Sequence, residues 1–244
     1  MLEQIAERIG RVIKPHFYTR VENSINAYNL YVYNIENLEL LKGNPCVFVA
    51  NHIKPEGDKN VYRSSGLSPD SFLLRRVILN TLGQDVHFVA QYDPNDLGTL
   101  RDKIPGARSV LKRFHKGMLR GFDVIPVSKR TGAVNVDFFR DAKTAVARKE
   151  SIFIYPFEDW MDDFNPEQKI ESGAAYLAQK LDVPIFPIYV FGCKTWNPKP
   201  NQETTIVFGK PFSAKGITIE QTNSKIREEL TALQNLVRAK NHEQ

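Results

Sequence analysis

One histidine follows a short apolar run and precedes a stretch that contains three acids. The run CVFVA at residues 46–50 leads to His52, and Glu56, Asp58 and Asp70 come next among the acids. A neutral imidazole can take a proton from a hydroxyl or an amine, and a carboxylate on its other ring nitrogen fixes the tautomer and stabilises the imidazolium. These residues predict proton-transfer chemistry with His52 as the base, and the residues alone leave the acid partner open.

A second group of acids follows another apolar run. Glu158 and Asp159 come directly after SIFIYPF at residues 151–157. If both runs are parallel strands, their carboxyl ends meet at one edge of a sheet, which is where ligands bind in open α/β folds. His52, Glu158 and Asp159 are therefore expected at the same edge. A loop histidine and a solvated acidic loop are the alternative interpretations.

The rest of the chain alternates strand-like and helical patterns, which indicates an α/β fold. Strand-like runs lie at 28–34, 46–50, 86–90, 122–127, 151–155, 184–192 and 205–209. Helical patterns lie at 69–82, 106–120, 133–148, 170–181 and 218–240, and Ser68 and Pro69 are typical of a helix start. An amphipathic helix is expected from residue 2 until Pro15 ends it. It packs on the core or lies on a bilayer interface, and we favour the core.

We expect one domain over residues 1–244, with a largely parallel, mixed central sheet flanked by helices. Residues 1–40 form a lead-in of helix and strand, residues 41–215 hold the motifs, and a helix comes last over 216–244. Apolar residues on the predicted helix at 69–82 line either a core or an acyl-chain slot.

Composition limits the partners and the compartment. The chain has 244 residues and a net charge of +5, which favours an anionic partner, but it shows no nucleic-acid-binding signature. Cys46 and Cys193 lie in apolar segments, as expected of reduced thiols in the cytoplasm. Neither a membrane span nor a metal site is predicted, so we expect a cytoplasmic protein with at most peripheral contact at the inner membrane face.

Five motifs, in order, resemble those of the glycerolipid acyltransferase superfamily, the lysophosphatidate acyltransferase group. They are FVANHIKPEGDK with SPDSFLL, GFDVIPVSKRTG, IFIYPFEDW, ESGAAYLAQKLDVPIFPIYVFG and VFGKPF, over about residues 40–215. The resemblance implies acyl transfer from a thioester, on coenzyme A or an acyl carrier protein, to a hydroxyl or an amine. It implies no cofactor beyond that co-substrate and no covalent acyl-enzyme.

The resemblance also assigns roles to residues. His52 would be the general base, and Asn51 would lie beside the substrate. Lys129 and Arg130 would bind a phosphate, because a guanidinium clamps phosphate with two parallel bonds. Glu158 and Asp159 would contact the acceptor, and backbone N–H groups of the third motif would hold the thioester oxyanion.

The first motif departs from the family. Where the family has its aspartate, this chain has Gly57. We prefer Asp70 as the partner of His52, because DSFLL resembles the family's aspartate and the helix start after it, and residues 53–69 then form an insertion. Asp58 and Glu56 stay open as alternatives.

The third motif departs as well, because acids and Trp160 stand where the family has Glu-Gly-Thr. Extra negative charge would repel a phosphate, which suggests an amine or a neutral hydroxyl compound as the acceptor. A thioesterase or ester hydrolase, or a non-catalytic lipid- or carrier-binding protein, is the alternative function.

Overall fold

The structure is a computed structural model, and it describes residues 1–26, 28–54, 68–91, 107–127, 136–157, 160–195 and 202–242. Its strands are β1 (Asn29–Tyr33), β2 (Val47–Ala50), β3 (Val86–Gln91), β4 (Ile125–Val127), β5 (Ser151–Ile154), β6 (Ile185–Phe191) and β7 (Glu203–Phe208). They form one sheet in the order β1-β7-β6-β2-β5-β3-β4, parallel except for the antiparallel pair β6 and β7. The predicted α/β class with a mixed, largely parallel sheet is confirmed.

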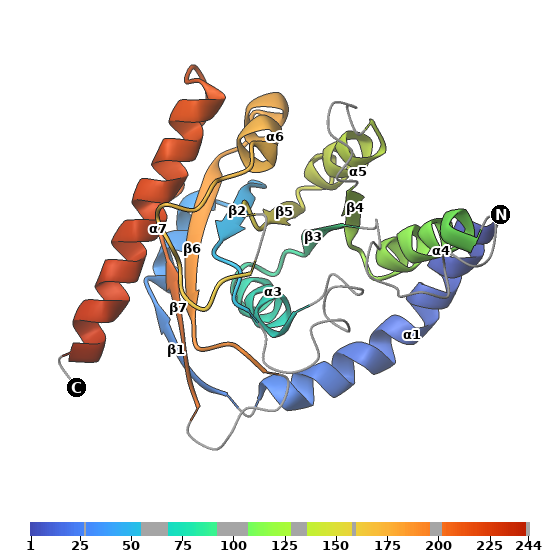
Figure 1. Cartoon of the computed structure of the whole chain (residues 1–244), viewed down its shortest axis with the longest axis horizontal. Helices are drawn as coiled ribbons and strands as arrows, with labels where there is room; N and C mark the ends of the chain where they lie inside the picture. The colour runs from blue at the N-terminus through green and yellow to red at the C-terminus, as the bar shows by residue number, and fades with distance from the viewer. Residues whose placement is uncertain are drawn as a thin grey trace.

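Helices cover both faces of this sheet (Figure 1). They are α1 (Leu2–Ile25), the 3₁₀ helix η1 (Ile35–Leu41), α3 (Pro69–Leu82), α4 (Ala107–Gly121), α5 (Val136–Ala147), α6 (Gly173–Leu181) and α7 (Ile219–His242). One core lies between the sheet and α3 with η1, and a second lies between the sheet and α5, α6 and α7. Strand β2 contributes to both, because Phe48 and Ala50 face the first core and Val47 and Val49 the second.

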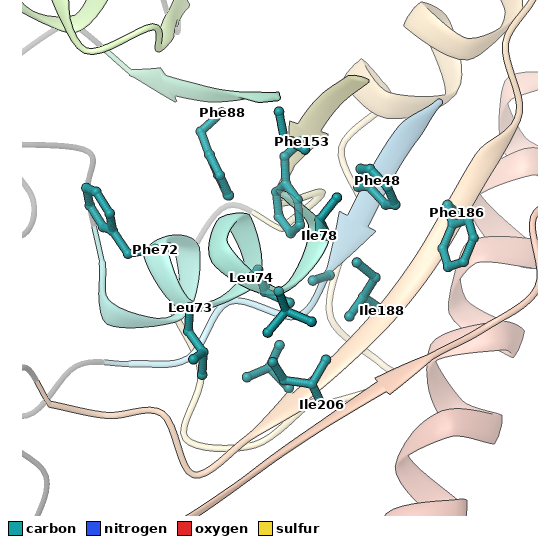
Figure 2. Packing of buried hydrophobic residues seen from close by; sticks show 14 of the residues in the cluster. Phe48, Phe72, Leu73, Leu74, Ile78, Phe88, Phe153, Phe186, Ile188 and Ile206 are labelled. Carbon is teal, nitrogen blue, oxygen red and sulfur yellow. The ribbon is translucent and has the colours of Figure 1, made fainter. Parts of the chain in front are cut away.

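Helix α3 packs directly on the sheet and thereby fixes the position of its first turn. Figure 2 shows Leu73, Leu74 and Ile78 among the sheet residues, and all three are completely or almost completely buried. The apolar face of this helix therefore belongs to the core, which was one of the two interpretations of its sequence pattern. The helix begins at Pro69 after the N-cap Ser68, as predicted, so Asp70 lies in its first turn.

The prediction that Pro15 ends the first helix is wrong. Helix α1 continues to Ile25 with Pro15 inside it, although proline removes a backbone hydrogen bond at a cost of about 3 kcal/mol or more. Tertiary contacts beyond the proline offset this cost. The Tyr18 hydroxyl donates to the Phe122 carbonyl at 3.1 Å, and the Tyr18 ring packs edge-on against Phe72 with 5.3 Å between ring centres.

Two other local predictions also differ from the structure. The expected strand at 122–127 is shorter, because residues 122–124 complete the end of α4 and Asp123 adopts a positive φ of 59°. The Val124 N–H bonds to the Leu119 carbonyl at 2.9 Å, which turns the chain before β4 begins. The 3₁₀ helix η1 was not predicted.

Glycines bring α1 and α4 unusually close together. A Cβ atom added at Gly117 would lie 2.2 Å from the Glu3 carbonyl oxygen, and one at Gly121 would lie 2.5 Å from the Glu7 carbonyl oxygen. Real Cβ atoms do not approach backbone this closely, so the helices would have to separate.

We expect Gly117→Ala to lower the free energy of unfolding by about 1 to 2 kcal/mol, because the overpacking cost exceeds the gain in helix propensity. Urea unfolding measures this. Gly173→Ala is the matched control, since a Cβ there meets nothing within 4 Å; it should change the stability by less than about 0.5 kcal/mol. Equal stabilities for the two variants would contradict the packing argument.

Candidate active site

The site lies where β2 ends beside the start of α3. His52 follows β2, and its Nδ1 lies 3.0 Å from Asp70 Oδ2. The Asp70 carboxylate is fully buried, whereas the His52 side chain keeps 17% of its surface exposed. One end of the pair is therefore fixed inside the protein, and the other keeps some contact with solvent.

Four donors hold the Asp70 carboxylate. Besides the His52 ring, they are the Ile53 N–H at 3.1 Å, the Ser71 N–H at 2.9 Å and the Ser68 hydroxyl. A buried carboxylate is costly unless it is hydrogen-bonded, and here both of its oxygens have partners. The donors come from the strand end and the helix start alike, so the carboxylate joins the two elements.

Tyr155 holds the flat face of the imidazole. It follows β5, and its ring stacks on His52 with 3.8 Å between ring centres and 13° between the planes. Its hydroxyl lies 3.0 Å from the Ser71 hydroxyl, which is 2.7 Å from the Ser68 hydroxyl. Burial, and after it the Asp70 charge, raises the pKa of Tyr155 well above its usual value, so the phenol stays protonated.

Trp160 occupies the other ring nitrogen of the histidine. Its indole N–H donates to His52 Nε2, and the two rings meet edge-on at 82°. An indole N–H can only donate, so Nε2 must be the acceptor. The imidazole is therefore neutral in this arrangement, with its proton on Nδ1 and shared with Asp70.

Asn51 faces the protein interior. Its side chain is completely buried, its Nδ2 donates to the Val190 carbonyl at 2.8 Å, and its Oδ1 accepts from the Val190 N–H at 2.8 Å. These bonds clamp the end of β2 to β6. In this geometry Asn51 positions the end of β2, whereas the sequence led us to expect a contact with the substrate.

Backbone pairing continues past the strand end and positions the third motif. The Met161 N–H bonds to the His52 carbonyl at 2.9 Å, and the Lys54 N–H bonds to the Met161 carbonyl at 2.8 Å. The Met161 N–H is thus engaged and is not a donor for an oxyanion. Lys54 and Asp162 also form an exposed ion pair at 3.7 Å.

Several sequence candidates lie outside the described residues: Glu56, Asp58, Lys129, Arg130, Glu158 and Asp159. Their roles stay predictions. Among the three acids considered for His52, Asp70 is the one that the described structure pairs with it.

Tyr155 and Trp160 were missed as neighbours of His52. Tyr155 directly follows a strand, as His52 nearly does, so its position at the strand end was the available signal. Trp160 was visible only as a departure from the family's third motif.

Both cysteines are buried, and burial raises the pKa of each thiol above its ordinary value. The Asp70 charge adds to this effect at Cys193. Neither thiol is an available nucleophile in the folded protein.

The described part of the chain shows neither a metal-ligand cluster nor a membrane span. No group of three or more histidine, cysteine and acidic side chains there could hold a metal ion. No helix within the same residues is long and apolar enough to cross a membrane.

Comparison with known proteins finds similarity in structure but not in sequence. No protein-family model matches the chain, and no curated protein matches its sequence. The structure is similar to that of the 1-acyl-sn-glycerophosphate (LPA) acyltransferase PlsC from Thermotoga maritima, with 15% sequence identity and a TM-score of 0.47. The alignment covers 93% of this chain and 80% of that one.

We expect Asn51→Ala to destabilise the protein by about 2 to 4 kcal/mol, because it leaves the buried N–H and C=O of Val190 without these partners. Chemical denaturation measures the loss. Asn29→Ala is the control, since Asn29 is exposed and its amide donates to the Tyr31 hydroxyl at the protein surface. A loss for Asn51→Ala no larger than the control would show that the clamp contributes little.

Proposed function

We propose that the protein is an acyltransferase that moves a fatty acyl group from a thioester to a hydroxyl or an amine. The observation that carries the proposal is the His52–Asp70 pair at the carboxyl end of strand β2. In this pair the histidine is neutral and is oriented by a buried carboxylate. The motif resemblance supports the choice of acyl transfer over other proton-transfer reactions.

In this mechanism His52 acts as a general base. The acceptor's oxygen or nitrogen attacks the thioester carbonyl carbon while Nε2 takes the acceptor's proton. Asp70 stabilises the imidazolium that forms, and the tetrahedral intermediate then collapses with cleavage of the C–S bond. The imidazolium returns the proton to the leaving thiolate.

The transfer is direct in this proposal, without a covalent acyl-enzyme. The hydroxyls of Ser68 and Ser71 are buried and bonded to Asp70 and Tyr155, and Asp70 is the partner of Nδ1, not of the base nitrogen Nε2. Cys193 is buried as a protonated thiol. None of these groups is arranged as a nucleophile activated by the base.

The donor is an acyl-coenzyme A or an acyl carrier protein, and the acceptor is a lysophospholipid-like compound or a small amino or hydroxy metabolite. No resident cofactor or metal is needed for this chemistry. A screen of acyl-coenzyme A and acyl-carrier donors against lysophosphatidate, amine and alcohol acceptors, read by mass spectrometry, tests the proposal. Donor cleavage without acylated product would favour a thioesterase, and binding without any turnover would favour a non-catalytic lipid- or carrier-binding protein.

We expect His52→Ala and Asp70→Asn each to lower kcat/KM by about 10² to 10⁴ while thioester binding is retained. Steady-state kinetics with the donor and acceptor found in the screen measure this. His87→Gln is the matched control, because His87 also pairs with a carboxylate, Glu150 at 2.9 Å, but away from the site. Its activity per folded molecule should stay within about twofold of wild type; full activity in His52→Ala would refute the mechanism.

We also propose that the protein is cytoplasmic and contacts the inner membrane face through α1. This helix turns Ala6 and Gly10 towards α4, while Ile5, Ile9 and Val12 are exposed at 47%, 42% and 71%. Exposed aliphatic residues along one helix, in a chain of net charge +5, suit an anionic lipid surface.

We expect Val12→Glu to weaken binding to phosphatidylglycerol vesicles at least about fivefold, because a charge replaces an apolar contact. Vesicle sedimentation measures binding. Gln4→Glu adds the same charge at an exposed polar position of α1 and is the control; it should have a smaller effect. Wild-type protein that stays in the supernatant would exclude this contact.

A further inference from the structure

The basic nitrogen of His52 is already occupied in the structure. A neutral imidazole offers one in-plane lone pair, and the Trp160 indole N–H takes it. An acceptor whose proton is to move to Nε2 must lie where the indole N–H lies. Trp160 and the acceptor are therefore mutually exclusive partners of His52.

The position of Trp160 is supported by its surroundings. The next residue, Met161, is fixed by hydrogen bonds with the His52 carbonyl and the Lys54 N–H, at 2.9 and 2.8 Å. Tyr155 meanwhile covers one face of the imidazole. The indole thus meets a ring that Asp70 and Tyr155 have already oriented, and together they limit the solvent contact of His52.

We propose that Trp160 is a specificity-determining residue: it holds Nε2 of His52 until the acceptor displaces it, and so protects the thioester from hydrolysis. The inference rests on the proposed function. Water that displaced the indole would exchange one hydrogen bond for another and gain little. A true acceptor brings further contacts of its own, which favour the exchange.

The unwanted hydrolysis follows the same steps as the transfer, with water in place of the acceptor. In hydrolysis, a water oxygen forms the new bond to the carbonyl carbon, Nε2 takes the water proton, and the C–S bond breaks to release the thiol and a fatty acid. Removing the indole N–H should open Nε2 to water and to the acceptor alike.

Trp160→Phe tests this, because it keeps an aromatic ring but removes the donor. We expect thioester hydrolysis without acceptor to rise about three- to tenfold and the acceptor KM to fall about two- to tenfold, the range for one net hydrogen bond, with kcat for transfer within about twofold. Hydrolysis is followed as release of coenzyme A thiol from palmitoyl-coenzyme A.

The control is Tyr189→Phe, which also removes one ring donor. The Tyr189 hydroxyl donates to Asp163 at 2.5 Å, and Tyr189 belongs to the second core, with α5, α6 and α7. The ratio to compare is the rate of hydrolysis without acceptor divided by kcat for transfer at saturating acceptor, and this variant should leave it unchanged. An unchanged ratio in Trp160→Phe, or a fall in kcat with no change in KM, would overturn the inference.

The contact between Trp160 and His52 can also be tested in the wild-type protein, without any substitution. In ¹⁵N NMR without substrate, His52 should show its proton on Nδ1, and the Trp160 indole N–H should show the shift of a hydrogen-bonded donor. The ring ¹⁵N shifts of His52 are compared with those of His87 in the same spectrum, because His87 also pairs with a carboxylate, through its Nε2, 2.9 Å from Glu150. An indole N–H with the shift of a solvent-exposed tryptophan would overturn the assignment.

The two proposals fail differently. Wild-type enzyme that neither transfers nor cleaves any thioester overturns the proposed function, and the present inference with it. Transfer activity that depends on His52, together with a hydrolysis ratio that does not depend on Trp160, overturns only the inference.

Discussion

One buried carboxylate joins the fold to its chemistry. Asp70 would be a costly charge inside the protein without its four donors, and these come from both sides of the junction between β2 and α3. The strand end supplies His52 and the Ile53 N–H, and the helix start supplies Ser68 and the Ser71 N–H. The contact that satisfies the charge is thus also the contact that orients the imidazole, so the site cannot be displaced without breaking the junction.

The order of strands explains which side chains surround the imidazole. Strand β2 lies between β5 and β6, so residues that follow β5 reach His52 from one side and β6 supports it from the other. From the β5 side come the ring of Tyr155 and the indole of Trp160, and from the β6 side comes the backbone of Val190, clamped by Asn51. His52 itself is thereby held from α3 and from the β5 side, and its neighbour Asn51 is held from β6. Such preorganisation lets a base act without reorganising during the reaction.

Local sequence patterns predicted most helices and strands, but they could not predict the contacts between them. The alternation of strands and helices, the helix start at Ser68 and Pro69, and the location of His52 after a strand all follow from local chemistry. The continuation of α1 past Pro15 depends on Tyr18 meeting residues far along the chain. Likewise, whether the Asn51 amide meets a substrate or a backbone depends on β6 lying beside β2, which no period in the sequence encodes. The roles assigned to residues 128–135 and 158–159 lie outside the described structure and stay predictions.

The indole contact also bears on which acceptors suit the site. Whatever replaces the Trp160 N–H must both donate a hydrogen to Nε2 and keep a lone pair for attack. A hydroxyl meets both requirements at neutral pH. An ammonium group donates but has no lone pair, and the acids next to Trp160 in the sequence would favour this charged form. Under the proposed function, this chemistry favours an acceptor with a hydroxyl at the reacting end and any positive charge carried elsewhere in the molecule, because the attacking lone pair is then kept.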